Sequence, residues 1–328
     1  MVFRLGLIGA GRMGRTHLRA LAGSERVAVT AIAEMSAAAR DLAAAPGVAM
    51  YDSVAALLDA GSLDGVLIAA PTDQHGGIIA EVAARGVPIL CEKPCGLTAA
   101  VARASAATAA ELDVPLQVAY WRRFVPGLQE LHDRIAAGSL GAIHLVTCYQ
   151  WDCEPPPLAF RAHSGGIAID MGVHEFDQLR WLTGQDIETV AAVSVPGPDG
   201  VDDVDSAQVV VSLSGGATGF VSLGRYYPAG DAVWAEVFGT GGSERCEVID
   251  PAEGERAQLD ALRRQAESFA SFAYGGPCEG ATASDAVAAL VAAELVSSRI
   301  LALSGSVASG ESGVAAELPP SYRHRAGG

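Results

Sequence analysis

Leu5-Gly6-Leu7-Ile8-Gly9-Ala10-Gly11-Arg12-Met13-Gly14 is the stretch that decides the fold of the first part of this chain. It joins an apolar run typical of a buried strand to a G-x-G-x-x-G motif, and the motif opens a helical pattern at Arg12–Ala22. Glu34 follows 20 residues after Gly14, at the end of the next apolar run. This context predicts a dinucleotide-binding turn, because a glycine loop between a strand and a helix brings backbone N–H groups to a pyrophosphate.

Each glycine of the motif has a separate predicted role. Gly9 permits the tight turn, Gly11 lets a pyrophosphate approach the backbone, and Gly14 lets the helix pack closely on the strand. The predicted cofactor contacts therefore run over the whole loop, at Gly9, Ala10, Gly11, Arg12, Met13 and Gly14. Glu34 is predicted to accept hydrogen bonds from ribose hydroxyls and to repel a 2′-phosphate, so we expect NAD rather than NADP. The alternatives are a tight turn without a ligand and an exposed carboxylate at a strand end.

Residues 1 to about 120 alternate between short apolar runs and helical patterns. Runs that are apolar on both faces fit strands covered by helices on both sides, and strand–helix alternation predicts a parallel sheet. With right-handed crossovers this is a doubly wound α/β domain of the Rossmann type, which we place at residues 1–121. The expected strands are Leu5–Ile8, Val27–Ala33, Gly65–Ala69, Pro88–Cys91 and Leu116–Ala119, and the expected helices are Arg12–Ala22, Ala37–Ala45, Val54–Ala60, His75–Arg85 and Thr98–Glu111.

The pattern changes after Tyr120. Consecutive β-like segments with no helix between them predict a second domain of the α+β class at residues 122–328, built on a large, mostly antiparallel open sheet. A tail from Gly305 to Gly328 is expected to pack loosely. The expected strands are Ile143–Trp151, Glu188–Val195, Ala207–Leu213, Thr218–Leu223, Ala232–Phe238 and Glu244–Ile249, and the expected helices are Pro126–Ala137, one from Asp170, Ala257–Tyr274 and Ser284–Leu303.

Composition excludes several classes of protein. Half of the 328 residues are hydrophobic, which argues against a disordered chain. The chain holds 22 basic and 38 acidic side chains, and this formal net charge of −16 argues against nucleic acid as the main partner. The six cysteines show no zinc-type spacing, so we expect reduced thiols and no metal site. The apolar start is too short for a signal peptide, and no later run reaches the ~20 residues of a membrane helix. A cytoplasmic protein without a membrane partner is the expectation.

Three places carry groups suited to chemistry beside a nicotinamide cofactor. Glu92-Lys93-Pro94 follows a predicted strand at the edge where parallel strands open onto a ligand crevice, so Lys93 is a candidate to bind a reacting hydroxyl. Asp170 and His174 are four residues apart, hence on one helical face, where the imidazole suits a general base and the carboxylate orients a hydroxyl. The alternatives are a surface lysine in a loop, and an N-cap aspartate beside a solvent-facing histidine.

The third place is the start of the second domain. Trp121 is a candidate to wall the nicotinamide or a sugar face, and Arg122 to donate to substrate hydroxyls. Asp152, Arg161 and His163 precede the Asp170 helix and are further candidates for binding hydroxyls. The competing explanation is packing at a domain junction for the first pair and an ordinary surface loop for the other three.

Together these residues resemble the Gfo/Idh/MocA oxidoreductase family, named for glucose–fructose oxidoreductase, inositol dehydrogenase and rhizopine catabolism. The resemblance is carried by Gly9–Gly14, Glu92-Lys93-Pro94, Arg123-Phe124 and Ser164-Gly165-Gly166 with Asp170 and His174, and it covers nearly the whole chain. The run Gln117–Phe124 is similar to the inositol dehydrogenase branch, and Phe160–Trp181 resembles scyllo-inositol and related sugar dehydrogenases.

The resemblance implies roles for residues that spacing alone does not assign. In family members that oxidise polyols, the positions of Lys93, Asp170 and His174 form the catalytic group, with Lys93 and Asp170 on the hydroxyl and His174 as acid/base. The positions of Trp121 and Arg122 face the substrate there. Family members use the open sheet of the second domain for contacts in dimers or tetramers. Further cofactor contacts are expected at Ala70, Pro71, Thr72, Gln74 and His75, at Glu92, Lys93 and Pro94, and at Trp121, although many members have Thr-Pro-Asn where this chain has Ala70-Pro71-Thr72.

The function predicted from these residues is NAD-dependent oxidation of a secondary hydroxyl of a cyclitol or sugar, by an inositol- or pyranose-type dehydrogenase that forms a homo-oligomer. Two alternatives belong to other classes. One is a glycosidase that oxidises its substrate transiently with bound NAD, and the other is a non-catalytic binder that senses NAD or sugar. An intact set of Lys93, Asp170 and His174 favours the dehydrogenase over the binder, because a binder needs no acid/base.

Overall fold

The computed structural model describes residues 1–197, 203–306 and 316–317. The chain divides into two compact units. The first unit consists of Met1–Phe124 and Gln258–Val287, and the second unit of Val125–Ala257 with the described part of the chain from Ala288 onward. Each unit has its own sheet.

The sheet of the first unit has the doubly wound order expected from the sequence. Within the described residues its strands follow the order β13-β6-β5-β4-β1-β2-β3, and every pair is parallel except β13 with β6. The order reverses at β1, which pairs with β2 on one side and β4 on the other. Ligands of such sheets bind at the carboxyl ends of the strands beside this reversal. The strands are β1 (Phe3–Ile8), β2 (Val27–Ala33), β3 (Ala49–Tyr51), β4 (Gly65–Ile68), β5 (Ile89–Glu92), β6 (Leu116–Ala119) and β13 (Ala281–Thr282).

The helices of the first unit begin in two ways. The side chains of Ser36, Ser53 and Thr98 cap α2, α3 and α5, each accepting a hydrogen bond from a backbone N–H one turn into the helix. The residue that precedes α1 is Gly11, which has no side chain and therefore cannot cap the helix. Its first N–H groups therefore remain available to a ligand. The helices are α1 (Arg12–Leu21), α2 (Ala37–Ala43), α3 (Val54–Asp59), α4 (His75–Ala83) and α5 (Ala99–Glu111), with the short turns η1 (Thr72–Gln74) and η2 (Trp121–Phe124).

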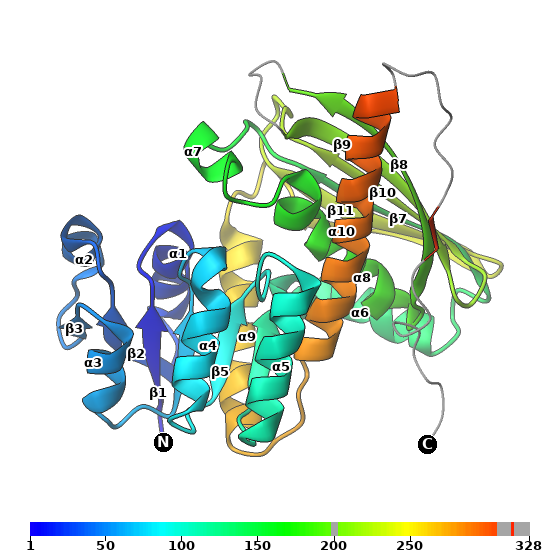
Figure 1. The fold of residues 1–328 in the computed structure, drawn as a ribbon. Helices are drawn as coiled ribbons and strands as arrows, with labels where there is room; N and C mark the ends of the chain where they lie inside the picture. Colours follow the sequence, from blue (N-terminus) through cyan, green and yellow to red (C-terminus); the bar gives the residue numbers. More distant parts are fainter. Residues whose placement is uncertain (198–202, 307–315, 318–328) are drawn as a thin grey trace. The chain divides into compact units, whose positions relative to one another are not determined.

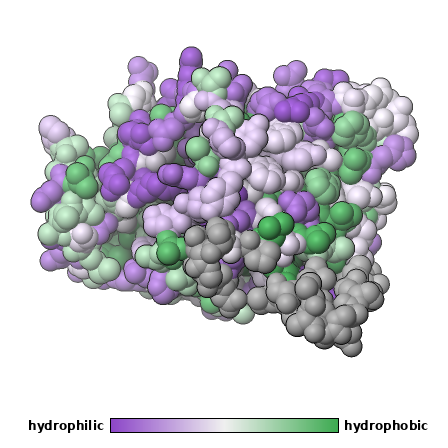
Figure 2. Space-filling view, turned by 90° about the horizontal axis from the view of Figure 1, so that it is seen from above, coloured by the Kyte–Doolittle hydropathy of each residue, from purple (hydrophilic) through white to green (hydrophobic). Residues whose placement is uncertain are grey.

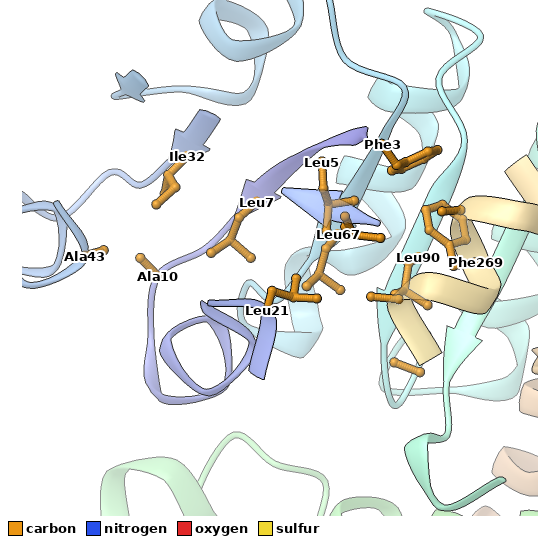
Figure 3. Packing of buried hydrophobic residues seen from close by; sticks show 14 residues of the cluster. Phe3, Leu5, Leu7, Ala10, Leu21, Ile32, Ala43, Leu67, Leu90 and Phe269 are labelled. Atoms are coloured by element: carbon orange, nitrogen blue, oxygen red, sulfur yellow. The ribbon is translucent and has the colours of Figure 1, made fainter. Parts of the chain in front are cut away.

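The core of the first unit packs the central strands against helices from both ends of the sequence. Leu5, Leu67 and Leu90 are fully buried on neighbouring strands (Figure 3). The ring of Phe3 meets Phe269 edge to face, with ring centroids 5.8 Å apart. Phe269 belongs to α9 (Arg256–Ala273), so this helix completes the core.

The boundary of the first unit differs from the sequence expectation, which placed all residues after 121 in the second domain. Gln258–Val287 belongs to the first unit because Phe269 packs on Phe3 and because Ala281 pairs with Val118 at the edge of the sheet. A strand of two residues gives no periodic signal, which is why β13 escaped the sequence analysis.

The second unit is built on the predicted mostly antiparallel sheet (Figure 1). Its order in the described residues is β12-β11-β7-β10-β9-β8-β14, and the β7–β10 pair alone is parallel. Helices α6 (Pro126–Ala136) and α8 (Val173–Thr183) pack together on one face, against β12 and β7. The strands are β7 (Ile143–Trp151), β8 (Ile187–Pro196), β9 (Val204–Leu213), β10 (Thr218–Gly224), β11 (Ala232–Gly239), β12 (Gly242–Ile249) and β14 (Ala316–Glu317).

The remaining segments connect these layers. The short helix α7 (Leu158–Arg161) and the π-helical turn η3 (Ala168–Gly172) lead into α8, and α10 (Ala283–Ser306) is the last helix among the described residues. The expected loose tail, Gly305–Gly328, lies mostly outside the described residues, although Ala316–Glu317 pairs with β8. Within the described part of the chain, no helix is both long and apolar enough to cross a membrane. The face drawn in Figure 2 mixes hydrophilic and hydrophobic residues.

Candidate active site

The glycine loop has the geometry that a bound pyrophosphate requires. Gly9 has φ +93°, and a Cβ there would lie 2.7 Å from backbone atoms of Ala69 and Ala70. A Cβ on Gly14 would collide with the carbonyl oxygen of Gly9, so this glycine sets the distance between α1 and β1. A Cβ on Gly11 would meet nothing within 4 Å. Gly9 and Gly14 are thus needed by the fold itself, whereas Gly11 leaves open space beside the start of α1.

Glu34 is tied to the glycine loop by hydrogen bonds. Its Oε2 accepts from the backbone N–H of Ala10 at 2.7 Å, and its Oε1 accepts from the N–H of Ser36 at 2.8 Å. Arg40 donates from Nη1 to the carbonyl oxygen of Glu34 at 2.6 Å, which holds the end of β2 against α2. The half-buried carboxylate therefore lies beside the loop, as a ribose-binding carboxylate does.

The segment after β4 is held from inside by His75. Ala70 and Pro71 lead into η1, which contains Thr72 and Gln74, and His75 begins α4. The His75 side chain is 1% exposed, with Nδ1 2.8 Å from the carbonyl oxygen of Pro94 and Nε2 2.9 Å from that of Ala70. A neutral imidazole donates only one of these hydrogen bonds. His75 thus joins the segments that follow β4 and β5, with both ring nitrogens facing protein oxygens.

The segment after β5 rests on a buried pair that the sequence analysis did not identify. His17 Nε2, on α1, lies 2.6 Å from Glu92 Oε1, and both side chains are almost fully buried. Glu92 Oε2 accepts from the backbone N–H of Lys93 at 3.2 Å, and the Lys93–Pro94 peptide bond is cis. Burial raises the pKa of the neighbouring Cys91 thiol, so this cysteine stays protonated. The backbone of Lys93 is therefore linked, through the Glu92 carboxylate and His17, to the helix that follows the glycine loop.

Trp121 and Arg122 lie in η2, directly after β6. Both are buried, and the guanidinium carbon of Arg122 lies 6.0 Å from the centroid of the Trp121 ring. Arg123 Nη2 lies 3.4 Å from Asp285 Oδ2, an ion pair between η2 and the start of α10. The strand order places the end of β6 at the same edge as the ends of β4 and β5. The first unit thus gathers every predicted cofactor residue at the carboxyl ends of its parallel strands.

In the second unit, Asp170 lies inside the π-helical turn η3 and His174 lies in the first turn of α8. Gly165 and Gly166 precede the turn with φ +84° and +83°, a region that non-glycine residues rarely adopt. The backbone N–H groups of Ile169 and Asp170 both bond to the Gly166 carbonyl oxygen, at 3.1 and 2.9 Å. π-helical turns occur frequently at functional sites. His174 is 6% exposed, and its Nδ1 is buried.

The loop before the turn divides into buried and exposed parts. Arg161 is buried, with Nε 3.2 Å from Asp203 Oδ2 and Nη2 2.9 Å from Asp205 Oδ1, so its guanidinium is engaged by carboxylates of its own unit. Burial alone lowers the pKa of Arg161, but the hydrogen bond to Asp203 and both negative charges raise it above its usual value. His163 is exposed.

Asp152 directly follows β7, and its N–H donates to the carbonyl oxygen of Gly224 at 2.9 Å. Gln150 Nε2 donates to its Oδ1 at 3.2 Å. Burial raises the pKa of Asp152, and the charges of Asp231 and Asp170 add to this rise, while the Gln150 hydrogen bond and Arg225 oppose it. Asp152 is thus the one proposed hydroxyl-binding group of the loop that is both half-buried and close to other charges.

Sequence reasoning missed Arg225, Asp203 and Asp205. Arg225 directly follows β10 and is fully buried, with Nη2 3.0 Å from Asp203 Oδ2 and 3.8 Å from Asp170 Oδ2. A signal was present, because Arg225 stands two residues after the β-like run Thr218–Leu223, at a strand end, where charged side chains meet others from neighbouring strands. The sequence analysis interpreted that run as an ordinary strand of the sheet and therefore assigned no role to Arg225.

Comparisons with known proteins follow the same division of the chain. A profile described as "Oxidoreductase family, NAD-binding Rossmann fold" matches residues 3–120, and one described as "GFO/IDH/MocA C-terminal domain" matches residues 128–245. The rhizopine catabolism protein MocA of Rhizobium meliloti is 51% identical over 300 residues, which cover 89% of this chain and 93% of that protein. The chain belongs to the Gfo/Idh/MocA oxidoreductase family.

Other members of the family are similar over most of their length. The inositol 2-dehydrogenase of Rhizobium meliloti (strain 1021) is 34% identical, over 80% of this chain and 81% of that protein. A crystal structure of a myo-inositol dehydrogenase from Corynebacterium glutamicum ATCC 13032 has a TM-score of 0.85 and 25% identity, over 98% of this chain and all of that one. These similarities confirm the predicted family, the predicted two-part fold and the predicted NAD-binding domain.

The residues of the first unit fit NAD. The open space at Gly11 leaves room for a pyrophosphate beside uncapped N–H groups, and Glu34 places a carboxylate next to the same loop. Bound NAD supplies a carbon that accepts a hydride from the substrate. What the chain itself must add is a substrate site and a group that moves one proton.

Proposed function

We propose that this chain oxidises one secondary hydroxyl of a cyclitol or a pyranose with NAD. Loss of a hydride from the carbon and of a proton from the hydroxyl converts the alcohol to a ketone, so the protein must hold the hydroxyl and remove its proton. We assign the proton to the His174 imidazole and the orientation of the hydroxyl to Lys93 and Asp170.

The observation that carries the proposal is the build of the segment holding Asp170 and His174. Asp170 lies in a π-helical turn and His174 in the first turn of the helix that follows it. The turn is preceded by two glycines with positive φ and is bonded through backbone N–H groups to Gly166. A protein that only binds NAD needs none of these features. Histidine titrates near neutral pH and so suits the removal of a hydroxyl proton.

The backbone of Lys93 is also held in place. Its backbone N–H bonds to Glu92, and Glu92 pairs with His17 on the helix that follows the glycine loop. The ammonium group of a lysine whose backbone is anchored in this way is suited to donate to the reacting oxygen and to stabilise the negative charge that grows there. The further substrate contacts that we propose are Asp152 and His163 on the loop before η3, and Trp121 and Arg122 in η2.

The substrate class rests on two kinds of support. Relatives of this chain are named inositol 2-dehydrogenases, and the family also includes a protein named for rhizopine catabolism that is 51% identical. An uncharged polyol also suits a chain with a net charge of −16, because it needs no basic surface to bind.

A steady-state assay tests the proposal. Purified protein with NAD is offered myo-inositol, scyllo-inositol, other cyclitols and a set of pyranoses, and formation of NADH is followed. We expect turnover of at least one cyclitol, and its loss in Lys93→Ala and His174→Ala. The matched control is His144→Ala, an exposed histidine on β7 that should leave the rate unchanged. Absence of NADH with every compound contradicts the proposal.

We also propose that the chain forms a homo-oligomer, a dimer or a tetramer, through the open face of the second unit's sheet. On this face Val193, Val195 and Val210 are 65%, 57% and 47% exposed, although Val190, Val209 and Val211 on the opposite face are buried. Tyr149 stacks on Trp234 with centroids 4.4 Å apart on neighbouring strands. Exposed valines gathered on one face of a sheet are typical of a protein interface.

Light scattering of Val210→Glu tests the oligomer. Wild type should show a multiple of the chain mass, and the charge on the open face should reduce that mass. A monomeric wild type contradicts the proposal. We further propose a cytoplasmic location, since the six cysteines, all within the described residues, form no disulfide, as expected in a reducing compartment.

A further inference from the structure

A buried cluster of charges lies directly behind Asp170. It consists of Arg161, Arg225, Asp170, Asp203 and Asp205, and we call it the Arg225 cluster. The Arg225 and Arg161 side chains are 0% exposed, and those of Asp203 and Asp205 are 3% and 8% exposed. Two cations and two carboxylates buried this deeply, beside an Asp170 side chain that is 17% exposed, need a reason, because a buried ion cluster rarely stabilises a fold more than apolar residues of the same size.

Arg225 reaches Asp170 directly. Its Nη2 lies 3.0 Å from Asp203 Oδ2 and 3.8 Å from Asp170 Oδ2, so one nitrogen faces two carboxylates. Its backbone N–H donates to the Asp205 carbonyl oxygen at 2.9 Å, which fixes the base of the side chain to β9. The backbone that carries the guanidinium is therefore held at the adjoining ends of β9 and β10.

Arg225 also reaches the backbone before Asp170, through Asp203. Asp203 Oδ1 accepts from the N–H of Ile167 at 3.0 Å, and Asp203 Oδ2 faces Arg225 and Arg161. Ile167 directly precedes η3. The carbonyl oxygen of Gly166 accepts from the N–H of Asp170 at 2.9 Å. A continuous series of contacts therefore joins Arg225 both to the carboxylate of Asp170 and to the backbone of Asp170.

We propose that Arg225 is a positioning residue for the reaction, which holds the Asp170 carboxylate and the π-helical turn in place from behind. This inference rests on the proposed function only in assigning Asp170 to the substrate hydroxyl. The cluster replaces solvent around Asp170 with fixed charges, so the carboxylate meets the hydroxyl already oriented. A small misplacement of such a group costs a large part of the rate.

Hydrogen exchange measured by mass spectrometry tests the positioning without any activity. In Arg225→Met, the peptide that contains residues 162–172 should exchange about tenfold faster than in wild type, because Ile167 and Asp170 lose their restraint. Peptides of β11 and β12 should not change. The matched control is Arg180→Met, which breaks another buried ion pair of the second unit, with Asp186 at 2.7 Å, without touching the turn. Unchanged exchange at 162–172 in Arg225→Met overturns the proposal.

A double-mutant cycle tests whether Arg225 acts through Asp170. Arg225→Met should lower kcat about 10- to 100-fold with the KM for NAD unchanged. In the Asp170→Asn background the same substitution should have little further effect, because the group that it positions is already changed. Effects that multiply in the double mutant overturn this assignment. If wild type turns over no polyol, the proposed function fails, while the exchange experiment still decides the positioning.

Arg225→Lys keeps the test open if Arg225→Met does not fold. Lysine retains the charge and the long stem, but a compact ammonium replaces the planar guanidinium whose Nη2 faces both Asp203 and Asp170. We expect the same pattern of exchange and kcat changes, smaller in size. An Arg225→Lys protein with wild-type exchange and wild-type kcat counts against the proposal.

Discussion

Gly11→Ala and Gly14→Ala should separate binding of the cofactor from stability of the fold. A Cβ on Gly11 meets nothing within 4 Å, and the residue has φ −63° and ψ −162°, which alanine adopts without strain. A Cβ on Gly14 collides with the carbonyl oxygen of Gly9. The two substitutions add the same methyl group three residues apart, so they form a matched pair.

The expected sizes follow from that geometry. Gly11→Ala should leave the free energy of unfolding unchanged or raise it by about 0.4–1 kcal/mol, because alanine narrows the unfolded ensemble. Gly14→Ala should lower it by about 1–3 kcal/mol, as overpacking does. For NAD, the Gly11 methyl occupies the space where the pyrophosphate approaches the backbone. Loss of one charge-assisted hydrogen bond, about 1.5–3 kcal/mol, weakens binding roughly 10- to 150-fold.

Two measurements check the pair. Urea unfolding of the cofactor-free proteins gives stability, and NADH fluorescence titration gives affinity. Gly23→Ala is the control, because a Cβ there also meets nothing within 4 Å and the residue lies beyond the far end of α1. Wild-type NADH affinity in Gly11→Ala refutes the assignment of the loop to the pyrophosphate. Wild-type stability in Gly14→Ala refutes the packing argument.

Four further predictions concern single side chains. Glu34→Ser should raise the ratio of NADP to NAD activity, and an unchanged ratio would exclude Glu34 from cofactor choice. Leu67→Ala should lower the free energy of unfolding by about 2–5 kcal/mol in urea, whereas Leu42→Ala, at a site 71% exposed, should change it by less than about 0.5 kcal/mol. Because burial raises the pKa of Asp152, the unfolded chain ionises first as the pH rises through 3.8, so ionisation destabilises the fold above that pH. Asp152→Asn should therefore gain stability over wild type as the pH rises above 3.8, and a difference independent of pH would contradict this. Iodoacetamide at pH 8 should label the exposed Cys153 first and Cys246 slowly, because burial raises the pKa of Cys246 to about 11. Mass spectrometry measures the order of labelling, with Cys153→Ser as the reference, and labelling of Cys246 as fast as that of Cys153 would contradict the prediction.

Local patterns were enough to predict five of the six parallel strands that the described residues form in the first unit. Leu5–Ile8 and Leu116–Ala119 are short apolar runs, the second interrupted by Gln117, and each occupies a strand of the sheet. Ala49–Tyr51 and Ala281–Thr282 were not predicted, because strands of two or three residues form only when a neighbouring strand offers hydrogen bonds. The same reason explains the different boundary of the first unit.

The candidate site was predictable where its residues are close in the sequence. The glycine loop with Glu34, and Asp170 with His174, are short-range patterns with a chemical meaning. The Arg225 cluster joins residues more than 60 positions apart, from Arg161 to Arg225, through a sheet register that no local pattern contains. The π-helical turn was also hidden, because the spacing of Asp170 and His174 is the same in an α-helix.

The path of the chain has a consequence for its synthesis. The chain leaves the first unit after Phe124, returns at Gln258 and leaves again after Val287. A nascent chain that ends before Gln258 has no Phe269 to cover Phe3 and no β13 to pair with β6. Because domains generally fold in order from the ribosome, the nucleotide-binding unit begins first yet completes its core only after most of the second unit has been made. A fragment ending at Phe124 should expose apolar surface, and an independent first unit must carry Gln258–Val287 with it.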